Sequence, residues 1–393
     1  MRMRDEKNSI IRPSAGLSTR AVHAGGATPE VGKPVTTPIF QTSTFYNERG
    51  GGGEVLYTRY GNNPNHLALE ARIAALEGAD ACVATASGMA AIAVALLSAV
   101  ASGDTILAAR ALYGGTRTLL DRELARLGVT TTYADFFDES WRAALHTGVR
   151  LVLVETPTNP LVRVLDLAPI ADAARAAGAL LVVDSTFATP INFRPLEHGA
   201  DLVVHSATKY LGGHSDVTAG VVAGTTEAIE PVRERARIFG PTLDPHAAWL
   251  VERGIKTLAV RMERPHRNGT TVAQWCERHP RIRRVHYPGL PSHPDHETAA
   301  RILNGFGGML GIEVEGGGEA ATRFVERLRL CHVAPSLGGV ETLVSEPRHT
   351  SHAGLTAEDR ARIGIAAGFV RFSLGIEDAE DIIADIEDAL REA

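Results

Sequence analysis

Between residues 81 and 224 the chain alternates short apolar runs with helical segments, and this alternation constrains its fold more than any other feature. Seven runs have the length and composition of strands: 81–85, 105–109, 129–133, 150–155, 179–184, 201–205 and 219–224. They lack the in–out alternation of a strand with one exposed face, so helices must cover both faces of the sheet. The pattern predicts an α/β fold around a mainly parallel seven-stranded sheet.

Small and polar residues follow five of these runs, and the carboxyl ends of parallel strands are where such a sheet binds its ligands. These residues are Ser87 and Gly88; Tyr113, Gly114 and Gly115; Glu155, Thr156, Pro157 and Asn159; Asp184 and Thr186; and Ser206, Thr208 and Lys209. Ser87 and Gly88 begin an apolar helix, whose free N–H groups and dipole favour a bound phosphate. A ligand site is therefore predicted at this edge of the sheet.

Lys209 and Asp184 each allow two interpretations when the residues are taken alone. Burial just past an apolar strand would lower the pKa of Lys209 and make it an amine nucleophile, but a strand-end lysine also extends into water. A buried Asp184 needs a partner, either a helix N-terminus or a cationic ring nitrogen. Phosphate donors, an acidic strand end, an aromatic side chain and an activated lysine together match what pyridoxal 5'-phosphate (PLP) requires.

Five motifs at matching spacing resemble the trans-sulfuration, or Cys/Met-metabolism, family of PLP enzymes. They are ETPTNP (155–160), VVDSTFATP (182–190), HSATKYLGGHSD (205–216), PSLGGVETL (335–343) and VRFSLGIED (370–378). The resemblance runs from about residue 17 to the C-terminus and implies the type I fold of PLP-dependent transferases. It also implies three parts: an N-terminal arm (1–62) that contacts a neighbouring subunit, a large PLP-binding domain (63–254) and a smaller C-terminal α/β domain (255–393).

The resemblance implies a role for each matching residue around the cofactor. Lys209 holds PLP covalently and later moves protons. The phosphate is bound by Gly88, Met89, Ser206 and Thr208, with Tyr57 and Arg59 reaching it from a neighbouring subunit. The ring is contacted by Tyr113, Asn159, Asp184 and Thr186, of which Asp184 pairs with the pyridinium nitrogen.

The resemblance further implies a small amino-acid substrate and a homo-oligomer. Arg371, assisted by Ser336, is expected to bind the substrate α-carboxylate, while Tyr113 and Asn159 complete the substrate site and Tyr113 also acts as an acid or base. The expected assembly is a homotetramer built from dimers that share active sites.

The expected reaction is cystathionine γ-synthase-like γ-replacement, in which an activated homoserine ester and cysteine give cystathionine. The alternative is γ-elimination, as in cystathionine γ-lyases and methionine γ-lyases, giving 2-oxobutanoate and ammonia; a catalytically silent binding protein is the remote alternative. Five positions depart from motifs of the family and bear on the substrate: Gly115, Ser185, Pro335, Arg348 and His349. Arg348 and His349 are either extra basic groups for an anionic leaving group or solvated loop residues.

Charge and cysteine content exclude several other classes. A net charge of -6 without a basic block argues against nucleic acid or a membrane as a partner. Three widely spaced cysteines and an N-terminus without an apolar segment fit a cytoplasmic protein. His286, His293 and His296 lack convincing metal-ligand spacing, so no metal is expected. No GxGxxG follows a strand, which excludes a nicotinamide dehydrogenase.

The last part of the chain predicts a small α/β unit after a long connecting helix. Residues 244–264 have the pattern of that helix, although Gly254 weakens its middle. Strands are expected at 310–315 and 370–374, and helices at 319–330 and 377–391.

Overall fold

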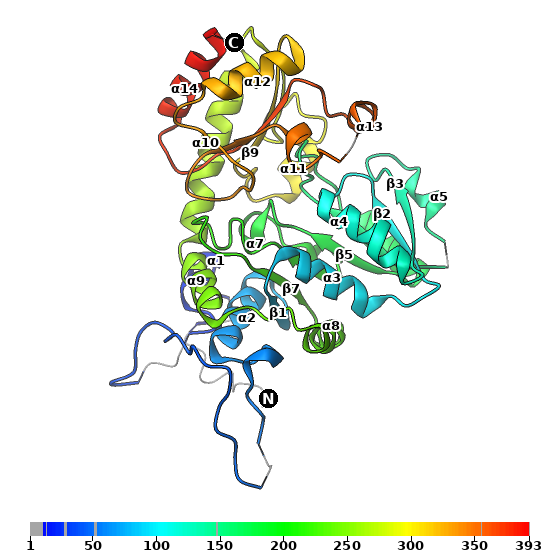
Figure 1. Ribbon diagram of the computed structural model, residues 1–393, viewed down its shortest axis with the longest axis vertical. Coiled ribbons are helices and arrows are strands. Elements are labelled where there is room, and N and C mark those ends of the chain that lie inside the picture. Colours follow the sequence, from blue (N-terminus) through cyan, green and yellow to red (C-terminus); the bar gives the residue numbers. More distant parts are fainter. Residues whose placement is uncertain are drawn as a thin grey trace.

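Two sheets organise the protein, one in each half of the chain (Figure 1). The computed structural model describes residues 11–392 apart from 13, 27–29, 51–52, 147 and 355. Residues 1–10 of the predicted N-terminal arm therefore lie outside the described residues. The expected boundaries between the three parts of the chain remain predictions.

The large sheet has seven strands in the order β1-β7-β6-β5-β4-β2-β3, and every strand except β7 runs parallel to the others. Its strands are β1 (Ala81–Thr85), β2 (Thr105–Ala109), β3 (Thr130–Ala134), β4 (Val149–Glu155), β5 (Leu180–Asp184), β6 (Leu202–His205) and β7 (Gly220–Gly224). The prediction of a mainly parallel seven-stranded α/β sheet is confirmed, with every strand within one residue of its expected bounds.

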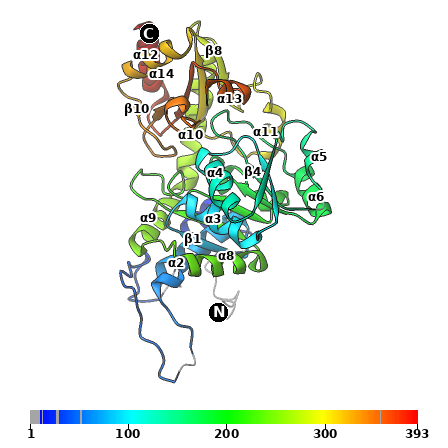
Figure 2. The same cartoon turned by 45° about the vertical axis from the view of Figure 1, so that its right-hand side comes forward.

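Helices cover both faces of this sheet, which explains why its strands lack polar alternation. Successive strand residues point to opposite faces. In β1, Val83 joins a core beneath α3 (Gly88–Ala99) and α8 (Thr226–Phe239), whereas Cys82 and Ala84 join a core beneath α2 (Pro64–Glu77) and α9 (Pro245–Ile255). In Figure 2, α3 and α8 lie near the centre of the large domain, with α2 and α9 to their left.

The other helices before residue 250 are short or peripheral. They are α1 (Leu17–His23), α4 (Gly114–Thr118), α5 (Trp141–Ala144), α6 (Ala168–Ala177) and α7 (Thr189–Asn192), with a π-helical turn η3 (Leu119–Leu124) and 3₁₀ turns η2 (Thr58–Tyr60) and η4 (Pro195–His198). Of these, α6 packs on β4 and β5, on the same core as α3. These turns place the residues that follow each strand at one edge of the sheet.

The second sheet has five strands in the order β10-β11-β12-β9-β8. They are β8 (Ile282–His286), β9 (Met309–Val314), β10 (His332–Val333), β11 (Leu343–Ser345) and β12 (Phe369–Ser373). Its helices are α10 (Leu258–Glu277), α11 (His296–Ile302), α12 (Gly317–Arg327), α13 (Ala357–Arg362) and α14 (Ala379–Glu392), with the 3₁₀ turn η5 (Pro347–His349). The expected strands 310–315 and 370–374 and helices 319–330 and 377–391 are found with shifts of one to three residues at their ends.

The single connecting helix predicted over residues 244–264 is wrong, because two helices occupy this stretch. α9 ends at Ile255 and α10 begins at Leu258, with Thr257 at φ −105° and ψ 5° between them. Arg261 compensates for the break by donating through Nη2 to the Gly254 carbonyl at 2.7 Å. Gly254 itself serves close packing, since a Cβ there would lie 2.2 Å from the Gly212 carbonyl oxygen.

β12 presents its alternate residues to two different environments. Val370 and Phe372 are buried in the core under α12 and α14. Arg371, one residue further round, points the opposite way and donates to Asn159 Oδ1 at 3.0 Å. The period of two in a strand therefore places a cation of the second sheet against the carboxyl edge of the first.

Within the part of the chain that the structure describes, no helix is both long and apolar enough to cross a membrane.

A buried ion pair joins α2 to α9 and predicts a large effect on stability. Arg72 Nη2 lies 3.1 Å from Glu252 Oε1, with side chains only 1% and 2% exposed. Because Glu252→Ala leaves a buried guanidinium without its carboxylate, we expect the free energy of unfolding to fall by about 3–5 kcal/mol in urea-induced unfolding. Glu123→Ala, which removes an exposed pair with Arg126, should change it by no more than about 0.5 kcal/mol. Equal effects of the two variants would contradict this account.

Candidate active site

A cavity of about 670 Å³ lies at the carboxyl ends of the large sheet, where residues of the second half of the chain close over it. All of the predicted site residues except Tyr57 and Arg59 line it: Gly88, Met89, Tyr113, Asn159, Asp184, Thr186, Ser206, Thr208, Lys209, Ser336 and Arg371. The structure thus brings together residues separated by up to 283 positions in sequence (371 minus 88). Their shared cavity is the candidate active site.

Lys209 follows β6 and points into the cavity rather than to bulk water. Its Nζ donates to Ser336 Oγ at 2.7 Å. Burial, and after it the positive charge of Arg371, lowers the pKa of Lys209 to about 8. A larger share of neutral amine is therefore present near neutral pH than for an exposed lysine, which favours the nucleophile interpretation over the extended strand-end interpretation.

Ser336 holds the two cationic groups of the cavity in place. Its hydroxyl accepts from Lys209, and its carbonyl oxygen accepts from Arg371 Nη2 at 2.9 Å. The residue has φ 96°, in the left-handed region that only glycine adopts without strain. Such a strained residue persists only where the surroundings fix it, and strained residues gather at functional sites.

Arg371 is a buried cation with unused binding capacity. Its guanidinium contacts the Asn159 amide oxygen and the Ser336 carbonyl, while its Nε has no hydrogen-bond partner among the described residues. Burial lowers its pKa to about 10. A guanidinium placed in this way is suited to an anionic ligand, such as a carboxylate that it can bind through two N–H groups.

Asp184 and Glu155 end the adjacent strands β5 and β4 and are paired in the sheet register. Asp184 Oδ1 accepts from both the hydroxyl (2.6 Å) and the backbone N–H (3.0 Å) of Thr186, so a turn rather than a helix N-terminus satisfies it. Burial raises the pKa of Asp184. Burial and then the charge of Asp184 raise the pKa of Glu155 to about 8. A cation bound beside Asp184 would stabilise this pair of carboxyl groups.

The N-terminus of α3 lies at one end of the cavity and is suited to an anion. Ser87 caps the helix by accepting from Ala90 N at 3.1 Å, and the first-turn N–H groups of Gly88 and Met89 have no partner within the helix. A Cβ on Gly88 would lie 2.6 Å from Ser206 Cβ, so only glycine lets the loop after β6 approach this closely. Donors from the helix and hydroxyls of Ser206 and Thr208 therefore surround one space.

Tyr113 begins α4 and exposes 44% of its surface at the cavity. Its backbone N–H donates to Glu155 Oε2 at 2.8 Å. A Cβ on Gly115 would lie 2.5 Å from Tyr113 Cε1, so the glycine leaves room for the ring. An accessible aromatic face at the cavity can stack on a planar ligand.

The positions that depart from the family motifs have different surroundings. His349 and Pro335 line the cavity, and both are exposed. Arg348 matches neither alternative: it does not line this cavity, and instead of being a solvated loop residue it lies 2.9 Å from Glu346 Oε2 and donates to the Gly318 carbonyl at 2.7 Å. Ser185 is fully buried outside the lining, and its hydroxyl has no partner among the described residues.

Several lining residues received no role from the sequence. Glu155 was noted only for its place at a strand end, although both of its oxygens organise the site. Phe187, Thr218, Leu337, Thr350 and Ser351 also line the cavity. In the loop of residues 349–351 the sequence singled out only His349; Thr350 and Ser351 are placed by packing, since a Cβ on Gly114 would lie 2.5 Å from the Ser351 carbonyl oxygen.

Tyr57 and Arg59 lie away from the cavity of their own chain. Arg59 donates to the Arg237 carbonyl at 2.9 Å, and its guanidinium lies over the ring of Tyr60, 4.9 Å from the centroid. Their predicted role at the phosphate of a neighbouring subunit stays a prediction.

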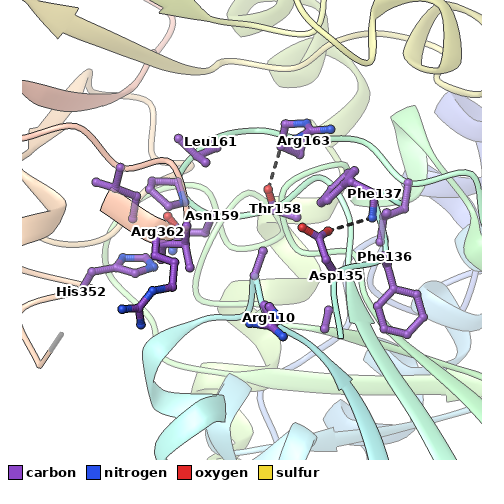
Figure 3. Close-up of a pocket in the computed structure, with 16 residues that line it drawn as sticks. Arg110, Asp135, Phe136, Phe137, Thr158, Asn159, Leu161, Arg163, His352 and Arg362 are labelled. Atoms are coloured by element: carbon purple, nitrogen blue, oxygen red, sulfur yellow. Dashed lines mark hydrogen bonds between the residues drawn. The ribbon is translucent and has the colours of Figure 1, made fainter. Parts of the chain in front are cut away.

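A second, smaller cavity of about 120 Å³ lies beside the first and shares Asn159 with it. It sits over the ends of β2, β3 and β4, between Arg110, Asp135 and Phe137 on one side and His352 and Arg362 on the other (Figure 3). No lysine is among the described residues that line it, whereas Lys209 lines the larger cavity.

The histidines considered as metal ligands have other contacts. His286 Nε2 lies 2.8 Å from Glu313 Oε1, and His296 Nδ1 lies 2.8 Å from the Pro288 carbonyl oxygen. In the described ranges, no three His, Cys, Asp or Glu side chains are grouped so that they could hold a metal ion.

Comparison with known proteins defines the class to which this site belongs. Residues 18–391 match the model of the Cys/Met metabolism PLP-dependent enzyme family. The chain is 43% identical to the O-succinylhomoserine sulfhydrylase of Pseudomonas aeruginosa, over 95% of this chain and 94% of the other. It is 42% identical to the L-methionine gamma-lyase of Porphyromonas gingivalis, over 98% and 99%. A crystal structure of cystathionine gamma synthase from Xanthomonas oryzae pv. oryzae in complex with cystathionine superposes with a TM-score of 0.93, at 40% identity, over 96% and 98%.

The chain is therefore a member of the Cys/Met metabolism family of PLP-dependent enzymes, as its motifs predicted. The residues of the cavity fit that cofactor: an amine of lowered pKa, a strand-end carboxyl group, an accessible aromatic ring and a helix N-terminus with two hydroxyls. The relatives are enzymes that act by γ-synthesis, γ-elimination or sulfhydrylation, and the protein is an enzyme of this type rather than a silent binding protein.

The lowered pKa of Lys209 predicts how its reactivity depends on pH. In cofactor-free protein, the ammonium should lose its proton as the pH rises through about 8, so labelling of Lys209 by an amine-reactive reagent should increase across that range. Arg371→Met removes a nearby positive charge and should shift the midpoint to higher pH; Arg264→Met, on the far side of α10, should leave it unchanged. Mass spectrometry of the labelled peptides measures this. An Arg371→Met midpoint equal to that of the parent protein would contradict the account.

Proposed function

We propose that the enzyme catalyses γ-replacement, joining the Cγ of an activated homoserine ester to the sulfur of cysteine to give cystathionine. The observation that carries the proposal is the arrangement around Ser336, which contacts Lys209 Nζ at 2.7 Å and Arg371 Nη2 at 2.9 Å. A base and a carboxylate-binding cation are thereby fixed relative to each other. An α-amino acid held by Arg371 would place its Cα within reach of Lys209.

The cofactor is assigned to the chain's residues as follows. Lys209 would hold the cofactor covalently, Asp184 would pair with the pyridinium nitrogen, and Tyr113, Asn159 and Thr186 would contact the ring. Gly88, Met89, Ser206 and Thr208 would bind its phosphate. When bound, PLP supplies an electron sink that stabilises negative charge developing at Cα and Cβ.

The remaining steps belong to the protein. Arg371, with Ser336 and Asn159, binds the α-carboxylate, and Lys209 Nζ accepts the Cα proton and then returns protons to the substrate. Tyr113 lies at the cavity mouth, where its hydroxyl can exchange a proton with the amino group or the incoming thiol. In the net reaction the Cγ–O bond breaks, the acid leaves as a carboxylate, the thiol loses its proton and a C–S bond forms.

The mouth of the cavity supports an ester with an anionic leaving group. His349 is an exposed basic side chain there, close to Thr350 and Ser351, and Pro335 contributes no negative charge. A distal carboxylate would find a hydrogen-bond donor in His349 and hydroxyls beside it. This combination favours a dicarboxylic acid ester over a simple acetate ester.

γ-Elimination is the second candidate, because the same residues perform its first steps. The 42% identity to an L-methionine gamma-lyase favours it as a class. Gly115 favours γ-replacement, because methionine γ-lyases are expected from the resemblance to have a cysteine at this position. A Cβ on Gly115 would also lie 2.5 Å from Tyr113 Cε1. The two reactions share their first steps, and the access of water to the cavity decides what fraction of the substrate undergoes elimination rather than replacement.

The proposal includes a homo-oligomer in which the N-terminal arm of one subunit completes the active site of a neighbouring subunit. The simplest such assembly is a homotetramer built from dimers. Residues 30–50 and 53–57 project from the body of the protein (Figure 1), and Val31, Val35 and Tyr46 are fully exposed, at 104%, 100% and 107%. Such large apolar side chains gain from burial against a partner. In that assembly Tyr57 and Arg59 would reach the phosphate of a neighbour. Three free, buried cysteines (Cys82, Cys276 and Cys331) agree with a cytoplasmic location.

A product assay tests the reaction directly. With an O-acylhomoserine and cysteine, we expect cystathionine as the product. When cysteine is omitted, we expect some 2-oxobutanoate, but much less of it than the amount of cystathionine formed when cysteine is present. O-succinylhomoserine should have a lower KM than O-acetylhomoserine, because its distal carboxylate meets His349.

The assay has a matched pair of lysine variants as its control. Lys209→Ala should abolish all products, and Lys256→Ala should leave them unchanged. Release of 2-oxobutanoate and ammonia from cystathionine or methionine, with no cystathionine formed from any ester, would replace γ-replacement by γ-elimination.

A further inference from the structure

Glu155 is a buried carboxylate that contacts two parts of the active site at once. It ends β4, is 5% exposed, and uses each oxygen separately. Oε2 accepts from the backbone N–H of Tyr113 at 2.8 Å, and Oε1 accepts from the backbone N–H of Asn159 at 2.8 Å. One side chain therefore fixes the start of α4 and the loop that follows β4.

The two residues bound by Glu155 are Tyr113, which provides the aromatic ring, and Asn159, which accepts a hydrogen bond from the Arg371 guanidinium. Tyr113 presents its ring to the cavity, and Asn159 Oδ1 accepts from Arg371 Nη1 at 3.0 Å. A connected path thus runs from Glu155 through Asn159 to Arg371. It begins on the large sheet and ends on β12 of the second sheet.

The chemistry of these contacts requires a carboxylate. Each oxygen of an ionised carboxylate accepts from an N–H group, whereas a glutamine would turn its own N–H₂ towards one of the two backbone donors. Burial and then the charge of Asp184 raise the pKa of Glu155 to about 8, even though the two N–H donors and the charge of Arg371 act in the opposite direction.

We propose that Glu155 is a positioning residue that sets the placement of Tyr113 and, through Asn159, of Arg371, and so determines how tightly the substrate α-carboxylate is bound. Glu155 has no contact with Lys209, Ser206 or Thr208 among its hydrogen bonds within the described residues. Its loss is therefore expected to weaken amino-acid binding far more than cofactor binding. The inference rests on the proposed roles of Tyr113, Asn159 and Arg371 in that site.

The test uses the loaded enzyme and L-alanine, an amino acid that has no leaving group at Cγ. Its Kd is measured from the change in the visible absorbance of the bound cofactor. Glu155→Gln is expected to load with cofactor as the parent does but to raise the Kd of L-alanine by about 10- to 100-fold, the usual effect of losing a hydrogen bond to a charged group. An unchanged Kd would overturn the proposal.

Asp201→Asn is the matched control. Asp201 also accepts from a backbone N–H of the large sheet, that of Leu181 at 2.7 Å, but it lies at the opposite end of the strands. Because it is remote from the cavity, Asp201→Asn should leave the Kd unchanged. An equal rise in both variants would show that loss of a carboxylate anywhere in the sheet has this effect, and would overturn the specific role of Glu155.

A double-mutant cycle tests the path through Asn159 even if Glu155→Gln folds poorly. Asn159→Ala removes the acceptor of Arg371 and should raise the Kd of L-alanine. In an Arg371→Lys background, Glu155→Gln and Asn159→Ala should each have a much smaller effect on that Kd. Full additivity of Asn159→Ala and Arg371→Lys would overturn the path. Since L-alanine undergoes no γ-chemistry, these results stand whichever reaction the product assay shows, and a failure of the proposed γ-replacement remains a separate finding.

Discussion

The contacts of Ser336 with Lys209 and Arg371 are the interaction on which the rest of the site depends. Lys209 follows the last parallel strand of the large sheet, Arg371 lies on β12 of the second sheet, and Ser336 binds one through its hydroxyl and the other through its carbonyl oxygen. The amine of lowered pKa and the buried guanidinium thus come from different halves of the chain. Ser336 holds a strained φ of 96°, which persists only where the surrounding structure fixes it.

The balance of charge in the cavity accounts for its fit to PLP. Glu155 and Asp184 place two carboxyl groups at adjacent strand ends, and burial raises the pKa of both. Arg371 offsets one charge, while Lys209, whose pKa is lowered to about 8, loses its positive charge only as the pH rises through that value. A pyridinium beside Asp184 and a phosphate at the start of α3 would place each charge opposite its complement.

Much of this arrangement could be predicted because it follows from local pattern. The seven strands were predictable from apolar runs, and the candidate residues from their position after strand ends, since parallel strands share one carboxyl edge. Contacts between distant segments were not predictable. The break between α9 and α10 depends on Arg261 and on the approach of Gly254 to Gly212; Arg348 is held by Glu346; and the double contact of Glu155 needs the path of the loop after β4. No period or motif encodes such contacts.

The central claim is that Lys209, among the lysines of the chain, is the residue that carries PLP. It has burial, a lowered pKa and the surrounding donors in its favour, whereas the remaining choice between γ-replacement and γ-elimination concerns the cavity mouth. The most direct measurement is borohydride reduction of the purified, cofactor-loaded enzyme followed by peptide mass mapping. The account predicts the mass of the reduced cofactor on the peptide that contains Lys209. Attachment at Lys7, Lys33 or Lys256, or no modified peptide at all, would contradict it.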